Sequence, residues 1–259
     1  MITQREIREK AREYGVPEST VERDYAQNRL LMAFSSLDMA LKGGTGIKKV
    51  YFGDYRFSDD LDFTLLKIVA KEKLEALIKE SIKKAKEESG INFSENIGFQ
   101  ENDNGFEIAV YFRILRGSGS PLKIKLDITQ SGNEEILLPL SKRIIIHPYS
   151  GNLEAEMKVY SLEEMVAEKV RSLFQRTRPR DLYDVWYLWN NVDKKKVLDI
   201  FPEKCKFKNV KIDVKGFENG KDNFKNAWEN SLRHQLKNLP TFEEVFSIVF
   251  EEVRKMRIF

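Results

Sequence analysis

Two carboxylates that could hold a metal ion lie one residue apart in an apolar stretch of the sequence. Asp60 and Asp62 flank Leu61, and side chains two residues apart on a β-strand point to the same face of the sheet. Two carboxylates at that spacing repel one another, so they must bind a cation or raise a pKa. Oxygen ligands favour Mg²⁺, which takes few carboxylates and completes its coordination with water and nucleotide phosphates. The pair therefore predicts metal-assisted phosphate chemistry.

A pair of glycines precedes these carboxylates by about one short helix and one turn. Gly43 and Gly44 allow a close approach of the backbone to a phosphate. A helix expected over residues 45–52, starting at Thr45, would direct its free N–H groups and its dipole at that anion. Taken singly, a Gly-Gly pair is usually only a turn, and an Asp-x-Asp is commonly a solvated strand edge. Their order along the chain favours the functional interpretation.

This order resembles the signature of the DNA polymerase β-like nucleotidyltransferases, in which a Gly-Gly or Gly-Ser turn opens a helix and the next strand carries Asp-x-Asp. Within that superfamily, Lys-Gly-Gly-Thr at 42–45 and Arg-Phe-Ser-Asp-Asp-Leu-Asp at 56–62 look like the AbiEii/AbiGii toxin family. The segment Val-Glu-Arg-Asp-Tyr at 21–25 is similar to the N-terminal segment of that family. The resemblance extends over about residues 20–190.

A lysine in the second half of the chain lies within an apolar helical stripe. Lys169 shares this stripe with four apolar residues, namely Leu162, Met165, Val166 and Leu173. A lysine stem that passes the core and reaches water is the ordinary explanation of such a position. Downstream, Asp181 and Asp184 share a helix face with apolar residues. A buried Lys–Asp pair with a purely structural role is the alternative to a catalytic one.

These later segments also resemble the AbiEii/AbiGii family, which pairs a helical lysine in an Ala-Glu-Lys context with a downstream Arg-Asp-x-x-Asp. Here the two motifs are residues 167–169 and 180–184. The resemblance implies that Asp60 and Asp62 bind two Mg²⁺ ions, that Lys169 contacts nucleotide phosphate, and that Asp184 positions Lys169 or a substrate hydroxyl. The implied nucleotide-binding residues are Gly43, Gly44, Thr45, Ser58, Lys169 and Asp181.

A third carboxylate is a candidate on a later strand. Residues 123–129 alternate between apolar and polar side chains, and Asp127 lies on the polar side. Members of the superfamily often take from such a strand a general base that also holds the catalytic metal; a solvated Asp is the alternative. Ser58 is a candidate for a phosphate contact or a turn cap. Arg56 is a candidate for holding a phosphate or pairing with a neighbouring acid.

Composition and charge narrow the class of protein. The chain has 259 residues, 41% of them hydrophobic, and carries a net charge of +3, so it can build a substantial core, and any nucleic-acid binding must use a local patch. A single cysteine, Cys205, excludes an intrachain disulfide and a thiolate zinc cluster.

No 18-residue apolar run or signal peptide is present, which predicts a cytoplasmic protein with no membrane partner. Walker A, Gly-x-Ser-x-Gly and Gly-x-Gly-x-x-Gly motifs are absent.

The periodicity predicts an α/β (α+β) fold with two lobes. Residues 1–160 are expected to form a nucleotidyltransferase-like core with N-terminal helices and a mixed sheet of about five strands, and residues 161–259 a helical C-terminal lobe. The strands predicted after Asp62 are 91–99, 106–115, 123–129, 143–147 and 157–160. The other predicted helices are 4–14, 18–39, 71–88, 161–175, 181–189, 193–200, 222–238 and 241–256, with a capping box at Ser161 and Glu164.

The resemblance implies transfer of a nucleoside monophosphate from an NTP to an acceptor hydroxyl, with pyrophosphate leaving. The acceptor is expected to be RNA, in particular tRNA, or a protein. The toxin role of the family implies a cognate antitoxin protein as a partner. The alternative from a different class is a non-catalytic NTP- or RNA-binding module built on a nucleotidyltransferase fold that has lost its activity.

Overall fold

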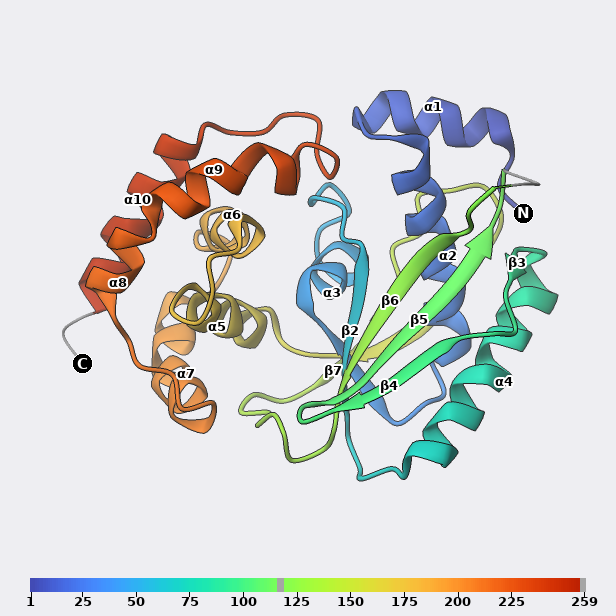
Figure 1. The fold of residues 1–259 in the computed structure, drawn as a ribbon, viewed down its shortest axis with the longest axis horizontal. Coiled ribbons are helices and arrows are strands. Elements are labelled where there is room, and N and C mark those ends of the chain that lie inside the picture. The colour runs from blue at the N-terminus through green and yellow to red at the C-terminus, as the bar shows by residue number, and fades with distance from the viewer. Residues whose placement is uncertain (116–118, 257–259) are drawn as a thin grey trace. The chain divides into compact units, whose positions relative to one another are not determined.

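The computed structural model describes residues 1–115 and 119–256 (Figure 1). The chain divides into two compact units. Unit 1 comprises Met1–Glu134 and Leu140–Tyr160, and unit 2 comprises Glu135–Pro139 and the chain from Ser161 onward. Unit 1 contains the sheet, and unit 2 consists of helices together with the short segment Glu135–Pro139. The predicted mixed α/β fold class is confirmed.

Among the described residues, the sheet of unit 1 has eight strands, in the order β3-β5-β6-β2-β1-β8-β7, with β4 also paired to β5. Pairings β2–β6 and β1–β8 are parallel, and the others are antiparallel. The strands are β1 (Met39–Lys42), β2 (Asp60–Leu65), β3 (Asn92–Phe93), β4 (Gly98–Asn102), β5 (Gly105–Arg113), β6 (Leu122–Thr129), β7 (Ser141–Ile144) and β8 (Glu156–Val159). The prediction of about five strands was therefore too low. The predicted strand 91–99 is two separate short strands, too short for alternation to resolve.

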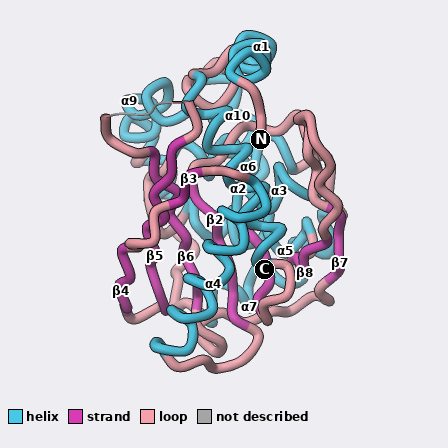
Figure 2. The backbone as a smooth tube through the Cα atoms, turned by 90° about the vertical axis from the view of Figure 1, so that its right-hand side faces the viewer, coloured by secondary structure: helices cyan, strands magenta, loops and turns pink. Residues whose placement is uncertain are grey.

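The helices of unit 1 are α1 (Gln4–Tyr14), α2 (Glu18–Phe34), α3 (Gly43–Val50) and α4 (Lys71–Ser89). Helices α2 and α4 pack on each other and lie beside the layer formed by β4, β5 and β6 (Figure 2). The predicted helix 18–39 ends earlier, and β1 follows it. All four residues of β1 are buried, so this central strand lacks the alternation that marks a half-exposed strand.

Strands β2 and β6 alternate as the sequence predicts. In β6, Ile124, Leu126 and Ile128 are buried, whereas Lys123 is exposed and both Lys125 and Asp127 are half-buried. In β2, Leu61 and Phe63 are buried, whereas Asp60 and Asp62, which alternate with them, are half-buried. The sheet therefore has an apolar face that enters the core and a polar face, called here the charged face, which carries the candidate site residues.

Unit 2 contains α5 (Leu162–Leu173), α6 (Pro179–Leu188), α7 (Lys194–Phe207), α8 (Val214–Asn219), α9 (Lys221–Leu232) and α10 (Phe242–Lys255). The helix predicted at 193–200 continues through Pro202, a residue that normally ends or kinks a helix. Helix α8 was not predicted, and α9 ends before residue 238. Within the described residues, none of the helices has an apolar stretch long enough to cross a bilayer.

Half of the predicted capping box is present at the start of α5. The Ser161 side chain accepts a hydrogen bond from the backbone N–H of Glu164. The Glu164 carboxylate instead accepts from the N–H groups of Leu137 and Leu138, at 2.8 and 2.9 Å. It also lies 2.7 Å from Lys204 Nζ, and both side chains are fully buried. Glu164 is therefore used to hold the segment Glu135–Pro139 onto the helices of unit 2.

Candidate functional site

Strand register brings the three predicted carboxylates of unit 1 onto the charged face. Asp62 of β2 is paired in parallel with Asp127 of β6, and on its other side with Lys42 of β1. Asp60 is paired with Lys125. Because residues paired across a sheet point to the same face, Asp60, Asp62 and Asp127 lie together on one surface. The register that makes Asp62 and Asp127 neighbours is not visible in the sequence.

Two lysines that the sequence analysis did not single out partly balance these acids. Lys125 Nζ lies 2.7 Å from Glu107 Oε2 and 3.1 Å from Asp127 Oδ1. Partial burial lowers the pKa of Lys125, but its hydrogen bonds to the two carboxylates outweigh that effect, so the pKa is raised overall. Lys42 is buried, with Nζ 3.6 Å from Glu134 Oε2. The alternation of β6 could have shown that Lys125 lies on the same face as Asp127. The positions of Glu107 and Lys42 beside these acids depend on the strand register, which the sequence does not show.

The glycine pair makes room for residues of the site itself. Gly43 begins α3 with φ +70°, and a Cβ placed there would lie 2.0 Å from Asp62 Oδ2. A Cβ on Gly44 would lie 3.0 Å from Arg56 Nη2 and 3.1 Å from Ser58 Oγ. A side chain at Gly43 would therefore displace the Asp62 carboxylate. Because the two glycines have no side chains, the Asp62 carboxylate and the Arg56 guanidinium can both lie close to the backbone at the start of α3.

The start of α3 is fixed to β2. Thr45 Oγ1 donates a hydrogen bond to the backbone carbonyl of Asp60. The helix begins at Gly43, two residues before the predicted start, and runs to Val50 rather than to residue 52. Its first N–H groups have no partner within the helix, and their dipole favours an anion. Ser58 and the buried Arg56 lie beside this end of the helix through their approach to Gly44.

Helix α2 holds the segment that leads into β2. Gln27 Nε2, fully buried, donates to the carbonyls of Ser58 and Asp59 at 2.9 and 3.1 Å. Arg23 Nη1 lies 2.6 Å from Asp59 Oδ1. The sequence analysis gave neither residue a role in the site, although Arg23 lies in the segment 21–25 that carried the family resemblance. These contacts fix the backbone immediately before Asp60.

In unit 2, the structure brings together the three polar residues predicted on two successive helices. Lys169 Nζ lies 2.9 Å from Asp181 Oδ1 and 2.9 Å from Asp184 Oδ2. The Lys169 side chain is 14% exposed, and those of Asp181 and Asp184 are 2% and 0% exposed. Arg176 Nε lies 2.9 Å from Asp181 Oδ2. Burial raises the pKa of Asp181, but Lys169 and Arg176 outweigh that effect and lower the pKa overall.

Comparison with known proteins identifies the family. A family model described as "Nucleotidyl transferase AbiEii toxin, Type IV TA system" matches residues 28–248. The chain belongs to this family. It is therefore a nucleotidyltransferase-type toxin of the toxin–antitoxin class. A search among curated protein sequences finds no match.

Two solved structures share the fold of this AbiEii chain. JHP933 from Helicobacter pylori is 19% identical, with a TM-score of 0.62, and the match covers 93% of each chain. MenT4, the nucleotidyltransferase toxin Rv2826c from Mycobacterium tuberculosis H37Rv, is 18% identical, also with a TM-score of 0.62. That match covers 100% of this chain and 89% of MenT4. At these identities the likeness concerns the fold.

The donor chemistry of the candidate site fits a hard divalent cation. Asp60 and Asp62 offer carboxylate oxygens from one face of β2, and Asp127 lies next to Asp62 in register, which is the ligand type that Mg²⁺ prefers. The close approach of the Asp62 carboxylate to Gly43 keeps a side chain out of that position. Asp127 is paired with Lys125, and among the described residues no three His, Cys, Asp or Glu side chains form a ready-made cluster. Asp60 and Asp62 are thus the residues best suited to hold the ion.

Proposed function

We propose that this AbiEii family member transfers a nucleoside monophosphate from an NTP to an acceptor hydroxyl. One observation carries the proposal: the parallel register of β2 and β6 aligns Asp62 with Asp127, on the face where Gly43 opens α3. Carboxylates beside a helix N-terminus combine a cation site with an anion site. A metal–triphosphate substrate requires both.

The residues of unit 1 have distinct roles in this proposal. Asp60 and Asp62 would hold two Mg²⁺ ions, which would neutralise charge on the triphosphate and activate the acceptor oxygen. The first N–H groups of α3, together with Ser58, bind phosphate oxygens. Asp127 takes the proton of the acceptor hydroxyl. The acceptor oxygen bonds to the α-phosphorus as the bond from that phosphorus to the bridging oxygen breaks, and pyrophosphate leaves with the electron pair.

In unit 2, Lys169 contacts nucleotide phosphate and stabilises charge that develops there. Asp184 and Asp181 are positioning residues, since both are buried and both lie 2.9 Å from its ammonium nitrogen. Two buried carboxylates restrict the position of the ammonium group. The Lys169 side chain retains slight exposure, which leaves it a path to a ligand.

The partners follow from the family and from this chemistry. The NTP is the donor, RNA and in particular tRNA is the acceptor, and a cognate antitoxin protein controls the toxin. The reaction belongs in the cytoplasm, where NTPs and tRNA are available. A protein hydroxyl is the other acceptor of the same chemistry.

Incubation with each α-labelled NTP, total RNA and Mg²⁺, followed by separation of RNA from protein, tests the proposal. We expect label in RNA with at least one NTP, and none when Mg²⁺ is chelated. Label confined to protein would replace RNA by a protein acceptor. No label in either fraction, combined with thermal stabilisation by NTP, would support a non-catalytic NTP-binding module instead.

A further inference from the structure

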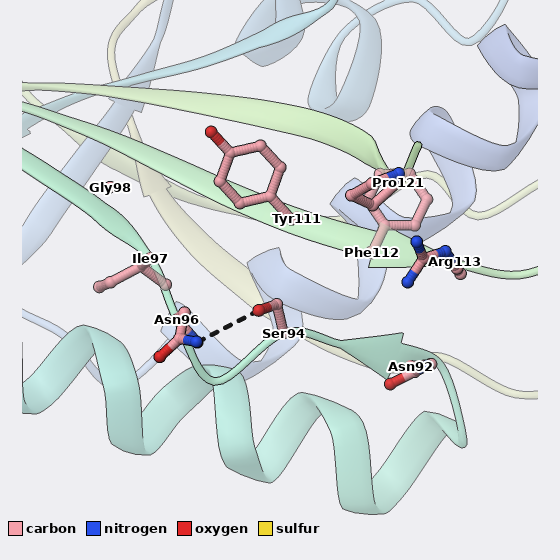
Figure 3. A pocket seen from close by; sticks show the side chains of 9 residues that line it. All are labelled: Asn92, Ser94, Asn96, Ile97, Gly98, Tyr111, Phe112, Arg113 and Pro121. Carbon is pink, nitrogen blue, oxygen red and sulfur yellow. Dashed lines mark hydrogen bonds between the residues drawn. The ribbon is translucent and has the colours of Figure 1, made fainter. Parts of the chain in front are cut away.

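The charged face of unit 1 continues away from the carboxylates to a pocket of about 480 Å³. Figure 3 shows the pocket between the loop that carries Ser94 and Asn96 and the end of β5 that carries Tyr111 and Arg113. The loop is held in shape by the N–H of Asn96, which donates to Ser94 Oγ at 3.2 Å. Asn92 also lines the pocket. No role assigned above involves these residues.

Sheet register relates this pocket to the candidate active site. Tyr111 is paired with Lys123 of β6, and Asp60 is paired with Lys125, two residues further along that strand. Tyr111 and Asp60 therefore point to the same face. With about 4.8 Å between strands and about 3.3 Å per residue, their Cα atoms are separated by roughly 12 Å. If the end of a polymer reacts above Asp60, a unit only a short distance along the same polymer can contact Tyr111.

The lining has the chemistry that recognises unpaired nucleotides. Tyr111 presents a half-exposed ring, and rings on an open sheet face are platforms on which unpaired bases stack. Arg113 donates from Nη2 to the carbonyl of Gly119, and its Nε is buried without a hydrogen-bond partner in the described part of the chain. The amides of Asn92 and Asn96 offer both donors and acceptors to a base edge.

Charge along the route also fits a nucleic acid backbone. Lys123 is exposed on the charged face between Tyr111 and the carboxylates, and Lys125 follows it. With Arg113, they place positive charge at the pocket and along β6, although the net charge of the chain is only +3. A backbone phosphate is attracted to this stretch. The acids nearest Lys125 are Glu107 and Asp127, which offset part of its charge, whereas Lys123 is exposed.

We propose that the pocket binds a base of a single-stranded nucleic acid acceptor, with the base stacked on Tyr111 and a neighbouring phosphate near Lys123 and Arg113. The inference rests on the proposed nucleotidyl transfer, because it places the reacting hydroxyl of that strand above Asp60 and Asp62. It adds to that function a binding site for the acceptor at a distance from the reacting atoms. Duplex bases are stacked on each other, so a duplex cannot use the site in this way.

Fluorescence anisotropy with a short fluorescein-labelled single-stranded RNA tests the pocket separately from catalysis. Tyr111→Ala should weaken binding roughly 5- to 150-fold, as the loss of one stacked base predicts. Tyr111→Phe, which keeps the ring, should bind within about twofold of the wild type. The same RNA annealed to its complement should compete poorly. Lys83→Ala, which removes an exposed lysine of α4, is the control for general charge and should change little.

Transfer kinetics then separate the two proposals. In Tyr111→Ala the KM for RNA should rise while the KM for NTP stays unchanged, and Asp62→Asn should lose transfer but keep RNA binding. Wild-type RNA affinity in Tyr111→Ala would overturn the pocket assignment even if transfer occurs. A rise in the KM for NTP alone would assign the pocket to the donor base and also overturn it. If RNA binding depends on Tyr111 but no nucleotide is transferred to any acceptor, the pocket assignment stands and the proposed function is rejected.

Discussion

The two charged clusters of this protein differ most in how far water reaches them. In unit 1, the side chains of Lys125 and Asp127 are 30% and 39% exposed. In unit 2, Asp181 and Asp184 are almost completely buried around Lys169. Solvated charges exchange partners at little cost, whereas buried charges are costly to separate. The sheet cluster is therefore suited to binding and releasing ions and substrates, and the helix cluster to holding one charge in a fixed place.

The clusters are also assembled differently. Lys169 and its two acids lie 12 and 15 residues apart on consecutive helices, so helical spacing alone suggests their meeting. Asp62 and Asp127 are brought together by the pairing of strands far apart in the sequence. Substitutions in the sheet cluster should therefore act chiefly on activity, and substitutions in the helix cluster on stability.

The largest expected effect is the loss of transfer in Asp62→Asn. Removal of one ligand should lower kcat by roughly 1,000-fold, because metal ligation supplies several kcal/mol of transition-state stabilisation. The melting temperature should stay level or rise, since repulsion with Asp60 is relieved. Asp103→Asn, in the exposed hairpin turn between β4 and β5, is the matched control and should retain full activity. Wild-type turnover by Asp62→Asn would remove the metal-site assignment.

The next largest effect is on the stability of Lys169→Met. The substitution leaves buried Asp184 without its lysine partner, and an uncompensated buried charge typically costs about 3–5 kcal/mol. Denaturant unfolding should show this loss, and adding Asp184→Leu should recover most of it. The activity of the double variant then decides the role of Lys169. If the stable double variant still transfers nucleotide, Lys169 is structural and the catalytic assignment is wrong.

The same cluster should respond to acid. The folded-state pKa of Asp181 lies below its ordinary value of 3.8, so its stabilising contribution is complete above that pH and is lost as pH falls through the folded-state pKa. In Lys169→Met the pKa of Asp181 should be lowered less, because its largest coulombic partner is gone. Unfolding free energy measured between pH 5 and pH 2 should therefore fall less steeply in this variant than in the wild type.

A smaller effect is expected where the backbone meets the sheet cluster. Gly43→Ala should cost about 3 kcal/mol, through the strain of positive φ together with displacement of the Asp62 carboxylate. Gly90→Ala has nearly the same φ, +71°, but an added Cβ there meets nothing within 4 Å. It should therefore cost only about 1 kcal/mol. Equal losses in the two variants, measured by denaturant unfolding, would show that Asp62 does not constrain the glycine.

Much of the local structure could be predicted from residue patterns. The alternation of β6 correctly placed Lys125 and Asp127 opposite the buried leucine and isoleucines, and Ser161 does cap α5. The helical stripes correctly suggested that Lys169 would meet the acids of α6. Each of these inferences depends on residues within one strand, within one helix or on two consecutive helices, where spacing in the sequence shows which side chains share a face. The catalytic roles of these residues stay predictions.

The features that the sequence did not predict depend on contacts between segments that are distant in the sequence. Strand β1 was not predicted, and its first residue was included in the helix 18–39, because a fully buried strand has no alternation. The Glu164 carboxylate was expected to complete a capping box, yet it binds backbone N–H groups of the segment Glu135–Pro139. The hydrogen bonds of Gln27 to the carbonyls before β2 likewise join α2 to a loop more than 30 residues away. Local patterns contain no information on such pairings.

The smallest effect is expected for Lys125→Met, which tests the contrast between the two clusters most directly. Like Lys169, Lys125 contacts two carboxylates, with Glu107 at 2.7 Å and Asp127 at 3.1 Å. All three side chains are partly solvated, so water can replace the lysine and the free energy of unfolding should change by no more than about 1 kcal/mol. The difference from the wild type should shrink further at high salt, which screens exposed charges. A loss as large as that of Lys169→Met would mean that burial does not distinguish the two clusters, and that the sheet cluster is as rigidly held as the helix cluster.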